Sequence, residues 1–228
     1  MSGAATVHEL FVTATAAQRH PELLDAARSA GVRVTTVTDK AAASLSDTVT
    51  PQGLIAVCDL LDVPVQVALA GPPALVVVLV GVADPGNAGT VVRVADAAGA
   101  GAVLLAGETV DPHNGKAVRA STGSVFHLPL ARGRDAAAVL AACRAAGLTL
   151  LAADGHGDLN LHDPRTATLL AGPTAWIFGG EAHGLSAELA ALADHRVRVP
   201  IHGRAESLNL ATAAAVCLYA SAAARRPA

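Results

Sequence analysis

The feature of this sequence that most restricts its fold is the apolar run LVVVLVGVA, at Leu75–Ala83. It is about nine residues long, too short for a membrane-spanning helix, which needs about 20. A strand that is apolar at every position is buried on both faces, whereas a strand with one exposed face alternates between apolar and polar residues. The run therefore predicts a central strand of a parallel sheet that has helices on both sides.

Segments of strand and helix length alternate along the chain from this run onward. The expected strands are Leu75–Val82, Ala102–Gly107, His127–Ala131, Thr149–Asp154, Ala175–Gly180 and Val197–Ile201. The expected helices are Gly89–Ala98, Asn114–Ser121, Ala136–Ala145, Ser186–Leu192 and Leu210–Ala223. Apolar strands that alternate with helices predict a parallel α/β sheet covered on both faces. We assign this domain to residues 74–228.

A smaller α/β unit is expected before it, at residues 1–62. Its strands are predicted at Leu10–Ala14, Val32–Val37 and 54–60, and its helices at Pro21–Ala30 and Lys40–Leu45. This order of strands and helices is typical of a small α/β layer. Residues 63–73, which contain three prolines, are interpreted as the linker between the two domains.

Cysteine usage and the N-terminus indicate the cellular compartment. Cys58, Cys143 and Cys217 are far apart and odd in number, so they form neither a zinc pattern nor a disulfide framework. The first ten residues lack the basic segment and apolar core of a signal peptide. We therefore expect a cytoplasmic protein with no membrane segment.

The charge balance gives no support to a nucleic-acid partner. The formal net charge is −3, whereas nucleic-acid-binding domains are usually basic. Up to Ala70, four basic residues face seven acidic ones, and from Gly71 onward there are twelve of each. An RNA-binding surface would therefore have to come from clustered basic side chains rather than from the overall charge.

The stretch Val197–Tyr219, near the end of the chain, combines a short strand, a glycine-containing loop and a helical run that starts at Leu210. Ser207 and Asn209 lie on the predicted turn into this helix. Free backbone N–H groups at a helix start face whatever docks there. The alternative interpretation is that Ser207 or Asn209 is simply an N-cap residue.

Two further segments, VGVADPGNAGTVVRVADAAGA at Val80–Ala100 and WIFGGEAHGLS at Trp176–Ser186, are equally specific. With Val197–Tyr219, they resemble in order the three motifs of the SpoU (TrmH-type) RNA ribose 2′-O-methyltransferases of the SPOUT superfamily. The first motif, N-x-G-x-x-x-R, corresponds to Asn87, Gly89 and Arg93. The second, G-x-E-x-x-G-[LM], corresponds to Gly179, Glu181, Gly184 and Leu185. The third, P-x-x-G followed by S-L-N, corresponds to Pro200, Gly203, Ser207, Leu208 and Asn209.

The resemblance implies a fold. It is a SPOUT-type parallel sheet with a C-terminal trefoil knot that threads the third motif under the second, preceded by an L30e-like α/β substrate-binding domain. The segment TPQGLIAV matches the last strand of that small domain. Relatives begin with an additional strand and helix, so we expect either an N-terminally shortened domain or a misassigned start. The resemblance also implies a homodimer formed through the knotted domains, for which the apolar helix Leu210–Ala223 is suited.

The resemblance likewise implies an S-adenosylmethionine-dependent RNA 2′-O-ribose methyltransferase. The L30e-like domain favours 23S rRNA as substrate, with a guanosine as the foremost target. A tRNA substrate and an antibiotic-resistance rRNA methylase are alternatives. A non-catalytic relative that binds RNA or S-adenosylmethionine is an alternative of another class. A nucleotide-binding α/β enzyme with a phosphate loop at 84–89 is a third class of function, although neither G-x-G-x-x-G nor G-x-x-x-x-G-K-[ST] is present there.

The residues that the resemblance marks as catalytic are Asn87, Arg93, Glu181, Ser207 and Asn209. The guanidinium of Arg93 is suited to bind a phosphate. In the family this arginine is also proposed to accept the 2′-hydroxyl proton, which is chemically awkward because an arginine guanidinium stays protonated at neutral pH. A carboxylate at the exit of an apolar strand needs a partner, and for Glu181 we expect Arg93 or a loop amide. Its alternative role is to stabilise the N-terminus of the helix at 186–192.

Cofactor and RNA contacts also follow from the resemblance. Backbone groups and glycines of the second and third motifs are expected to hold S-adenosylmethionine, at Gly179, Gly180, Gly184, Val199, Ile201 and Leu208. The stretch Asn114–Pro129 resembles the family's N-P-K-x-x-R-x-S-x-G segment, and its candidates for RNA binding are Lys116, Arg119 and Ser121. The alternative is an ordinary solvated helix face.

Nine histidines raise the question of a metal site. The densest cluster is His156, Asp158, His162 and Asp163. Its spacing fits no standard pair of ligands on a helix, and a polar loop explains it equally well. We expect no metal.

Overall fold

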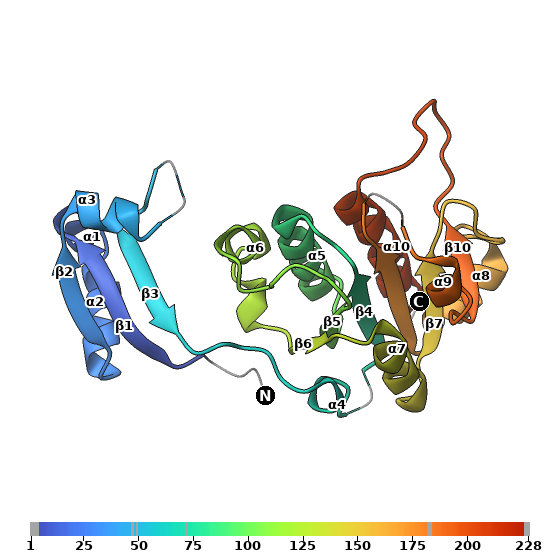
Figure 1. Cartoon of the computed structure of the whole chain (residues 1–228), viewed down its shortest axis with the longest axis horizontal. Coiled ribbons are helices and arrows are strands. Elements are labelled where there is room, and N and C mark those ends of the chain that lie inside the picture. Colours follow the sequence, from blue (N-terminus) through green and yellow to red (C-terminus); the bar gives the residue numbers. More distant parts are fainter. Residues whose placement is uncertain (1–4, 47, 49, 72, 182–183, 226–228) are drawn as a thin grey trace. The chain divides into compact units, whose positions relative to one another are not determined.

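The computed structural model describes residues 5–46, 48, 50–71, 73–181 and 184–225, and Figure 1 shows their course. The chain divides into a smaller unit, from residue 4 to 60, and a larger one, from residue 61 to 228. None of the helices in the described ranges has both the length and the apolar character that a membrane crossing requires.

The described residues of the smaller unit form a three-stranded sheet in the order β2-β1-β3. Strand β1 (Val7–Thr13) pairs in parallel with β2 (Arg33–Val37) and antiparallel with β3 (Leu54–Cys58). Helices α1 (Ala14–Arg19), α2 (Pro21–Ser29) and α3 (Asp39–Ser44) accompany the sheet. The core is small, with Leu10, Val12, Ala16 and Leu24 buried. The sequence did not predict α1, whose start is capped by the Thr13 hydroxyl.

The described part of the larger unit contains a sheet of seven parallel strands in the order β6-β5-β4-β9-β7-β10-β8. The strands are β4 (Leu75–Val80), β5 (Ala102–Ala106), β6 (Leu130–Gly133), β7 (Thr149–Ala153), β8 (Leu159–Asn160), β9 (Thr174–Gly179) and β10 (His195–Arg198). Every residue of β4 is buried. The prediction of a central strand covered on both faces is therefore confirmed.

Alternate residues of β4 serve two different cores. Leu75, Val77 and Leu79 pack into the core beneath α5 (Pro85–Ala97), α8 (Pro164–Ala171) and α10 (Leu210–Arg225). Val76, Val78 and Val80 pack on the other face, with α4 (Val65–Ala68), α7 (Ala136–Ala145) and α9 (Ala187–Ala190). Helix α6 (Gly115–Ser121), followed by the short 3-10 helix η1 (Ser124–Phe126), packs on α5. The sheet is thus the middle layer of three (Figure 1).

Two strands late in the chain are inserted between earlier ones. Strand β9 lies between β4 and β7, and β10 lies between β7 and β8. The chain then continues through a loop at 199–209 and returns as α10 against α5 and α8. This order brings the loop of the third motif to the first motif, which lies more than a hundred residues earlier.

The structure differs from the sequence-based expectation at several element ends. Strand β10 ends at Arg198, not Ile201, because its neighbour β8 ends at Asn160, opposite Arg198, and Pro200 has no N–H for a ladder. Strand β6 begins at Leu130, not His127, because His127 ends the short 3-10 helix η1 through the bond of its N–H to the Ser124 carbonyl oxygen. Helices α4 and α8 and strand β8 were not predicted. Helix α4 lies within 63–73, and Asp62 forms a parallel bridge with Leu130 in the larger unit.

Candidate active site

The three sequence motifs meet at one edge of the sheet. Asn87 lies in the first turn of α5, Glu181 follows β9, and Asn209 precedes α10. Loops at the carboxyl ends of parallel strands lie together, and this edge is where open α/β sheets bind ligands. The edge therefore gathers residues that are far apart in the sequence.

The side chain of Asn87 connects the other two motifs. Its amide nitrogen donates to Glu181 Oε1 at 2.8 Å, and its carbonyl oxygen accepts from Asn209 Nδ2 at 3.1 Å. A carboxylate can only accept hydrogen bonds, whereas an asparagine amide both donates and accepts. An asparagine at position 87 can therefore satisfy both neighbours at once.

Glu181 is held by backbone groups as well. Its Oε2 accepts from the Ala83 N–H at 3.4 Å. Partial burial raises the pKa of Glu181, but hydrogen bonds from Asn87 and from nearby backbone N–H groups outweigh it and leave the pKa below its usual value. Of the two partners expected for Glu181, the loop amide is present, and among the described residues Arg93 does not pair with it. The carboxylate is ionised at neutral pH.

Asn209 is an N-cap residue and also bonds to the first motif. Its Oδ1 caps α10 by accepting from Ala211 N at 2.9 Å and Thr212 N at 3.3 Å. Its Nδ2 is thereby free to donate to Asn87. The cap fixes the side chain so that one residue starts the helix and also joins the first motif.

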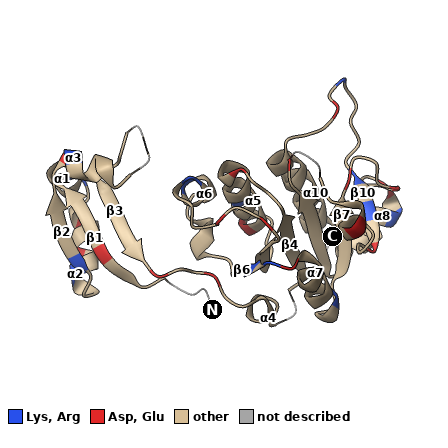
Figure 2. Cartoon of the chain, in the orientation of Figure 1, with Lys and Arg blue, Asp and Glu red and all other residues tan. Residues whose placement is uncertain are grey.

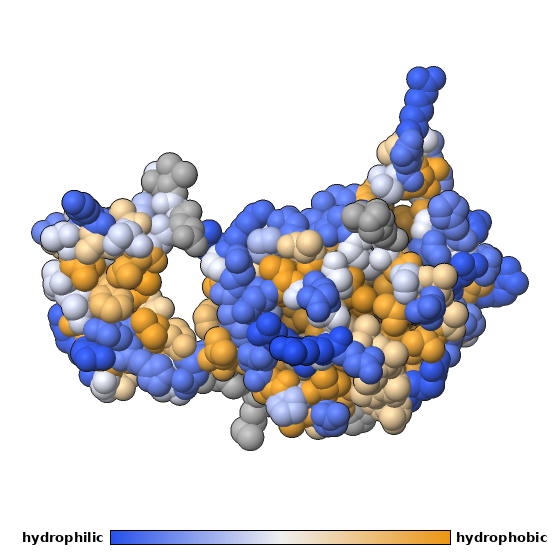
Figure 3. Space-filling view, viewed as in Figure 1, coloured by the Kyte–Doolittle hydropathy of each residue, from blue (hydrophilic) through white to orange (hydrophobic). Residues whose placement is uncertain are grey.

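A cavity of about 830 Å³ opens beside this network. The sheet contributes Phe178 to its lining, and the second and third motifs contribute most of the remainder. The predicted residues that line it are Gly179, Gly180, Glu181, Gly184, Val199, Ile201, Ser207, Leu208 and Asn209. The loop at 199–209 also extends outward as a hydrophilic projection, visible at the upper right of Figure 3.

The glycines at this cavity are required by close backbone contacts. A Cβ on Gly179 would collide with the backbone of Gly184 and Leu185, and a Cβ on Gly180 would collide with the carbonyl oxygen of Gly81. Gly184 has a φ of +63°, a conformation that side-chain-bearing residues rarely adopt. These glycines line the cavity without side chains, which suits an adenosine-containing ligand such as S-adenosylmethionine.

Arg93 lies apart from this network. Its side chain is exposed on α5 and does not belong to the lining of the cavity. Among the described residues, none forms a hydrogen bond or ion pair with it. Of the five predicted catalytic residues, the structure joins Asn87, Glu181 and Asn209 directly, places Ser207 in the cavity lining, and leaves Arg93 outside.

The predicted RNA-binding residues on α6 are in different environments. Lys116 is exposed and pairs with Asp84 Oδ1 at 2.6 Å, and Arg119 is exposed. Ser121 is fully buried and donates its hydroxyl to the Val118 carbonyl. Figure 2 marks basic residues in blue on α6, near β6 and at the tip of the loop after β10. The Ser121 side chain is therefore buried and is not part of an exposed docking surface.

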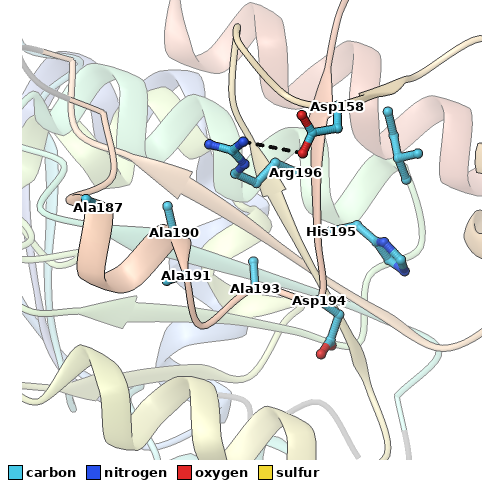
Figure 4. A pocket seen from close by; sticks show the side chains of 9 residues that line it. Asp158, Ala187, Ala190, Ala191, Ala193, Asp194, His195 and Arg196 are labelled. Atoms are coloured by element: carbon cyan, nitrogen blue, oxygen red, sulfur yellow. Dashed lines mark hydrogen bonds and ion pairs between the residues drawn. The ribbon is translucent and has the colours of Figure 1, made fainter.

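A second cavity, of about 450 Å³, lies between α9 and β10 (Figure 4). Arg196 points toward Asp158 across it, at 3.3 Å, and also lies 3.6 Å from Asp154. Asp194 pairs with Arg144 at 2.7 Å. Three charged residues of this cavity, Asp158, Asp194 and Arg196, are thus each held in an ion pair, and alanines of α9 form much of the remaining lining.

The expected absence of a metal concerned the His156–Asp163 loop. Within the described ranges, no group of three or more potential metal ligands comes together. Asp158 pairs with Arg196, and Asp163 caps α8 by accepting from Arg165 N. These contacts account for both carboxylates.

Sequence reasoning missed several residues of the site. Asp154 and Asn160 line the main cavity from the ends of β7 and β8. The signal was available for Asp154, because it directly follows a buried strand whose carboxyl end must lie at the same edge as the motifs. Asp84 was not predicted as a residue of this site, although it caps α5 by accepting from Gly86 N and Asn87 N, both at 3.2 Å.

Comparison with known proteins assigns this arrangement to a family. The SpoU rRNA Methylase family model matches residues 74–219. The chain belongs to the SpoU rRNA methylase family. A second model, described as RNA 2'-O ribose methyltransferase substrate binding, matches residues 1–64 of the same SpoU chain. The resemblance found in the three motifs is confirmed.

Relatives of this SpoU chain include two 23S rRNA methyltransferases. It is 35% identical over 190 residues to the 23S rRNA (guanosine(2553)-2'-O)-methyltransferase RlmP of Bacillus subtilis, covering 83% of this chain and 72% of that protein. It is 29% identical over 222 residues to the 23S rRNA (guanosine-2'-O-)-methyltransferase RlmB of Bordetella pertussis, covering 95% and 89%.

Solved structures of SpoU-type proteins share the fold. An AdoMet-bound rRNA methyltransferase from Sinorhizobium meliloti matches with a TM-score of 0.80 at 32% identity, covering 95% of this chain and 80% of that one. The SpoU methyltransferase AviRb from Streptomyces viridochromogenes, in complex with AdoMet, matches with a TM-score of 0.82 at 30% identity, covering 96% and 83%. The predicted fold class, a SPOUT-type parallel sheet domain preceded by a small α/β domain, is confirmed.

Proposed function

We propose that this chain is an S-adenosylmethionine-dependent RNA 2′-O-ribose methyltransferase that modifies 23S rRNA, with a guanosine as the foremost target. The observation that carries the proposal is the hydrogen-bonded set Asn87–Glu181–Asn209 beside the main cavity. It joins one residue from each of the three family motifs. A protein that had lost catalysis would be under no requirement to keep this particular set.

The choice of RNA rests on the relatives. RlmP and RlmB are named for guanosines in 23S rRNA, and residues 1–64 match the substrate-binding model of RNA 2′-O-methyltransferases. A further relative, from Streptomyces viridochromogenes and 38% identical over 141 residues, is named for a uridine in 23S rRNA. A uridine target and a tRNA substrate are therefore the outcomes against which the guanosine assignment is tested.

S-adenosylmethionine supplies an electrophilic methyl group to the ribose 2′-oxygen. The cavity fits it through the glycines and exposed backbone of Gly179–Gly180 and Gly184, with Val199, Ile201 and Leu208 facing the same space. Glu181, Asn87 and Asn209 hold the three surrounding loops in one geometry, so the reacting groups are oriented before they meet. The Ser207 hydroxyl, in the cavity lining, is positioned to bond the ribose.

Arg93 and the residues of α6 are assigned to the RNA backbone. Arg93, Lys116 and Arg119 are exposed on neighbouring helices. A guanidinium binds phosphate through two parallel hydrogen bonds, and such contacts position the RNA without reading its sequence. Ser121 supports the end of α6 from within. An arginine guanidinium stays protonated at neutral pH and is poorly suited to accept the 2′-hydroxyl proton, so phosphate binding is assigned as the first role of Arg93.

We further propose a cytoplasmic homodimer formed through the knotted domains. Helices α5 and α10 pack side by side, and α10 exposes Tyr219 over about half of its surface area. Size-exclusion chromatography with light scattering measures the dimer directly; a monomer at micromolar concentration would overturn the dimer proposal.

The smaller unit, here called the substrate-binding domain, is proposed to end near residue 62, with residues 63–73 as the connection to the larger unit.

The function is tested by tritiated methyl transfer from S-adenosylmethionine to unmodified bacterial RNA. We expect label in 23S rRNA at one guanosine that resists alkaline cleavage, because a 2′-O-methyl group removes the attacking hydroxyl. The Arg93→Ala variant should transfer little of this label to 23S rRNA. Arg134→Ala is the matched control, since Arg134 is an exposed arginine after β6 and outside the motifs.

Each outcome separates one alternative. Label in tRNA or at a uridine replaces the proposed target. S-adenosylmethionine binding without any labelled RNA identifies a non-catalytic binding relative. If the RNA is labelled but alkali still cleaves it after every nucleotide, the methyl group is on a base and the ribose assignment is overturned.

A further inference from the structure

Asp84 makes two kinds of contact at the start of α5. Its carboxylate caps the helix by accepting from Gly86 N and Asn87 N. The same group accepts from the Lys116 ammonium at 2.6 Å, across from α6. The Lys116 hydrogen bond and the backbone bonds keep the pKa of Asp84 below its usual value. Asp84 therefore joins a helix start that carries Asn87 to a lysine assigned to RNA.

The path of the lysine depends on Gly86. A Cβ built on Gly86 would lie 3.0 Å from Lys116 Cε and 3.4 Å from its Nζ. The lysine stem thus crosses directly over the first turn of α5. It lines a groove of about 460 Å³ together with Asn87 and Asn209. The ammonium is consequently held beside the residue that connects all three motifs.

The electrostatics of this position require the carboxylate. A helix N-terminus carries a partial positive charge, so a lysine ammonium is disfavoured beside it. The ionised Asp84 reverses the local charge and attracts the ammonium. Lysine has three N–H donors, and Asp84 Oδ1 accepts one. The Lys116 side chain is 59% exposed, so its remaining donors are accessible to a ligand.

We infer that Asp84 is a positioning residue that holds the Lys116 ammonium beside Asn87, where it binds a phosphate of the RNA substrate next to the target ribose. The inference rests on the proposed function. Asp84 itself touches neither substrate nor S-adenosylmethionine in this assignment. It acts by presenting Lys116 in one conformation and by fixing the helix turn from which Asn87 projects.

Asp84→Asn separates the two contacts of Asp84. Asparagine is as favourable as aspartate at a helix N-cap, although it offers one acceptor oxygen where Asp84 uses two, and it cannot form the ion pair. An effect of the weaker cap would persist in the Lys116→Met background, whereas the effect of the lost ion pair would not. Asp135→Asn is the matched control, because Asp135 caps α7 through Ala138 N and no cation within the described residues pairs with it. Lys116→Met removes the cation itself, and the double variant tests whether the two residues act through each other.

We expect Asp84→Asn to weaken RNA binding about 2- to 10-fold, the effect of having to immobilise one long side chain on binding. The KM for RNA should rise by the same factor, with kcat and the Kd of S-adenosylmethionine unchanged. Adding Asp84→Asn to Lys116→Met should have no further effect. The direction is diagnostic, because removing a negative charge would by general electrostatics tighten RNA binding.

Three results would overturn the inference. Tighter RNA binding by Asp84→Asn would show that Asp84 competes with RNA for Lys116. A fall in kcat at unchanged KM would place Asp84 in the chemical step, and equal losses in Asp135→Asn would show that the effect is not specific to the Asp84–Lys116 pair. Failure of the proposed function is distinct, because the wild-type protein itself would then transfer no methyl group to RNA.

A measurement without RNA checks the pairing itself. Lys116 should be acylated by acetic anhydride faster in Asp84→Asn than in the wild type or in Asp135→Asn, with the site resolved by mass spectrometry. Equal rates in all three proteins would show that the ion pair does not hold the amine, and the inference would fall.

Discussion

At the scale of single residues, the site depends on which atoms donate and which accept. Glu181 offers only acceptors, and Asn209 uses its oxygen to cap α10, so its nitrogen remains as a donor. Asn87 is the side chain that matches both. Replacing the amide nitrogen of Asn87 by an oxygen, as in aspartate, would turn the donor that Glu181 needs into an acceptor without changing the size of the side chain.

Asn87→Asp makes this exchange. Two carboxylates would then face each other across the 2.8 Å contact, so we expect a loss of methyl transfer of at least tenfold and a lower melting temperature at pH 7. The melting temperature difference from the wild type should shrink toward pH 5, because the two carboxylates can share a proton. Asn114→Asp is the control, since the Asn114 side chain caps α6 by accepting from Lys116 N and, among the described residues, forms no hydrogen bond to a carboxylate. A variant that melts like the wild type at pH 7 would contradict the network.

Glu181→Gln tests the ionised carboxylate through pH. The pKa of Glu181 is lowered in the folded protein. Its contribution to stability is therefore complete above the unfolded-state pKa of about 4.3 and is lost as the pH falls through the lower folded-state pKa. Urea unfolding should show a stability advantage of the wild type over Glu181→Gln that is constant from about pH 8 to 5 and declines below about pH 4. An advantage that grows toward acid would refute this, and Glu188→Gln, on α9, serves as the exposed control.

At the scale of elements, the first motif also sets the distance between two helices. A Cβ on Gly89 would collide with the carbonyl oxygen of Ala117 and lie 2.8 Å from Ala120 Cβ. The glycine of N-x-G-x-x-x-R is thus where α5 and α6 touch. The contact aligns Asn87 and Arg93 on one helix with Lys116 and Arg119 on the other.

Gly89→Ala should therefore destabilise the larger unit by about 1–3 kcal/mol, the usual effect of overpacking, although alanine favours helices. Thermal or urea unfolding measures it. Gly155→Ala is the control, because a Cβ there meets nothing within 4 Å. Stabilisation by Gly89→Ala would show that the helices can separate freely.

At the scale of the whole molecule, the two units have unequal cores. Among the described residues, the core cluster of the smaller unit contains four buried apolar residues, whereas both faces of β4 are covered in the larger unit. Folding free energy scales with the apolar area buried, so the smaller unit should be the less stable. Its loss would remove substrate binding but not the cavity.

Leu24→Ala makes this separation measurable. Leu24 is 5% exposed, so its truncation should cost the smaller unit about 2–5 kcal/mol. Hydrogen exchange should then rise in residues 5–60 alone, with S-adenosylmethionine binding retained and the KM for RNA raised. Leu23→Ala, on the same helix but 44% exposed, is the matched control. Faster exchange throughout residues 61–225 would instead indicate one cooperative unit.

The sequence alone was sufficient for the elements whose pattern is local. The β4 run predicted a strand buried on both faces because burial depends on the identity of each residue in turn. Helix α7 was predicted at its observed bounds because alanine, which makes up most of this run, has the highest helix propensity. The family followed from three motifs whose residues and order are visible in the chain.

The tertiary structure decided which of these residues act together. Arg93 and Ser121 were both selected by motif, yet one is exposed without a partner among the described residues and the other is buried against its own helix. Asp84, which carries the ion pair to Lys116, was not selected at all. Hydrogen bonds of 2.8 and 3.1 Å join residues 94 and 122 positions apart, and only the insertion of β9 and β10 between earlier strands brings them together. Local patterns record what one residue requires of its neighbours in the chain, whereas the partner of a polar group is set by the path of the whole fold.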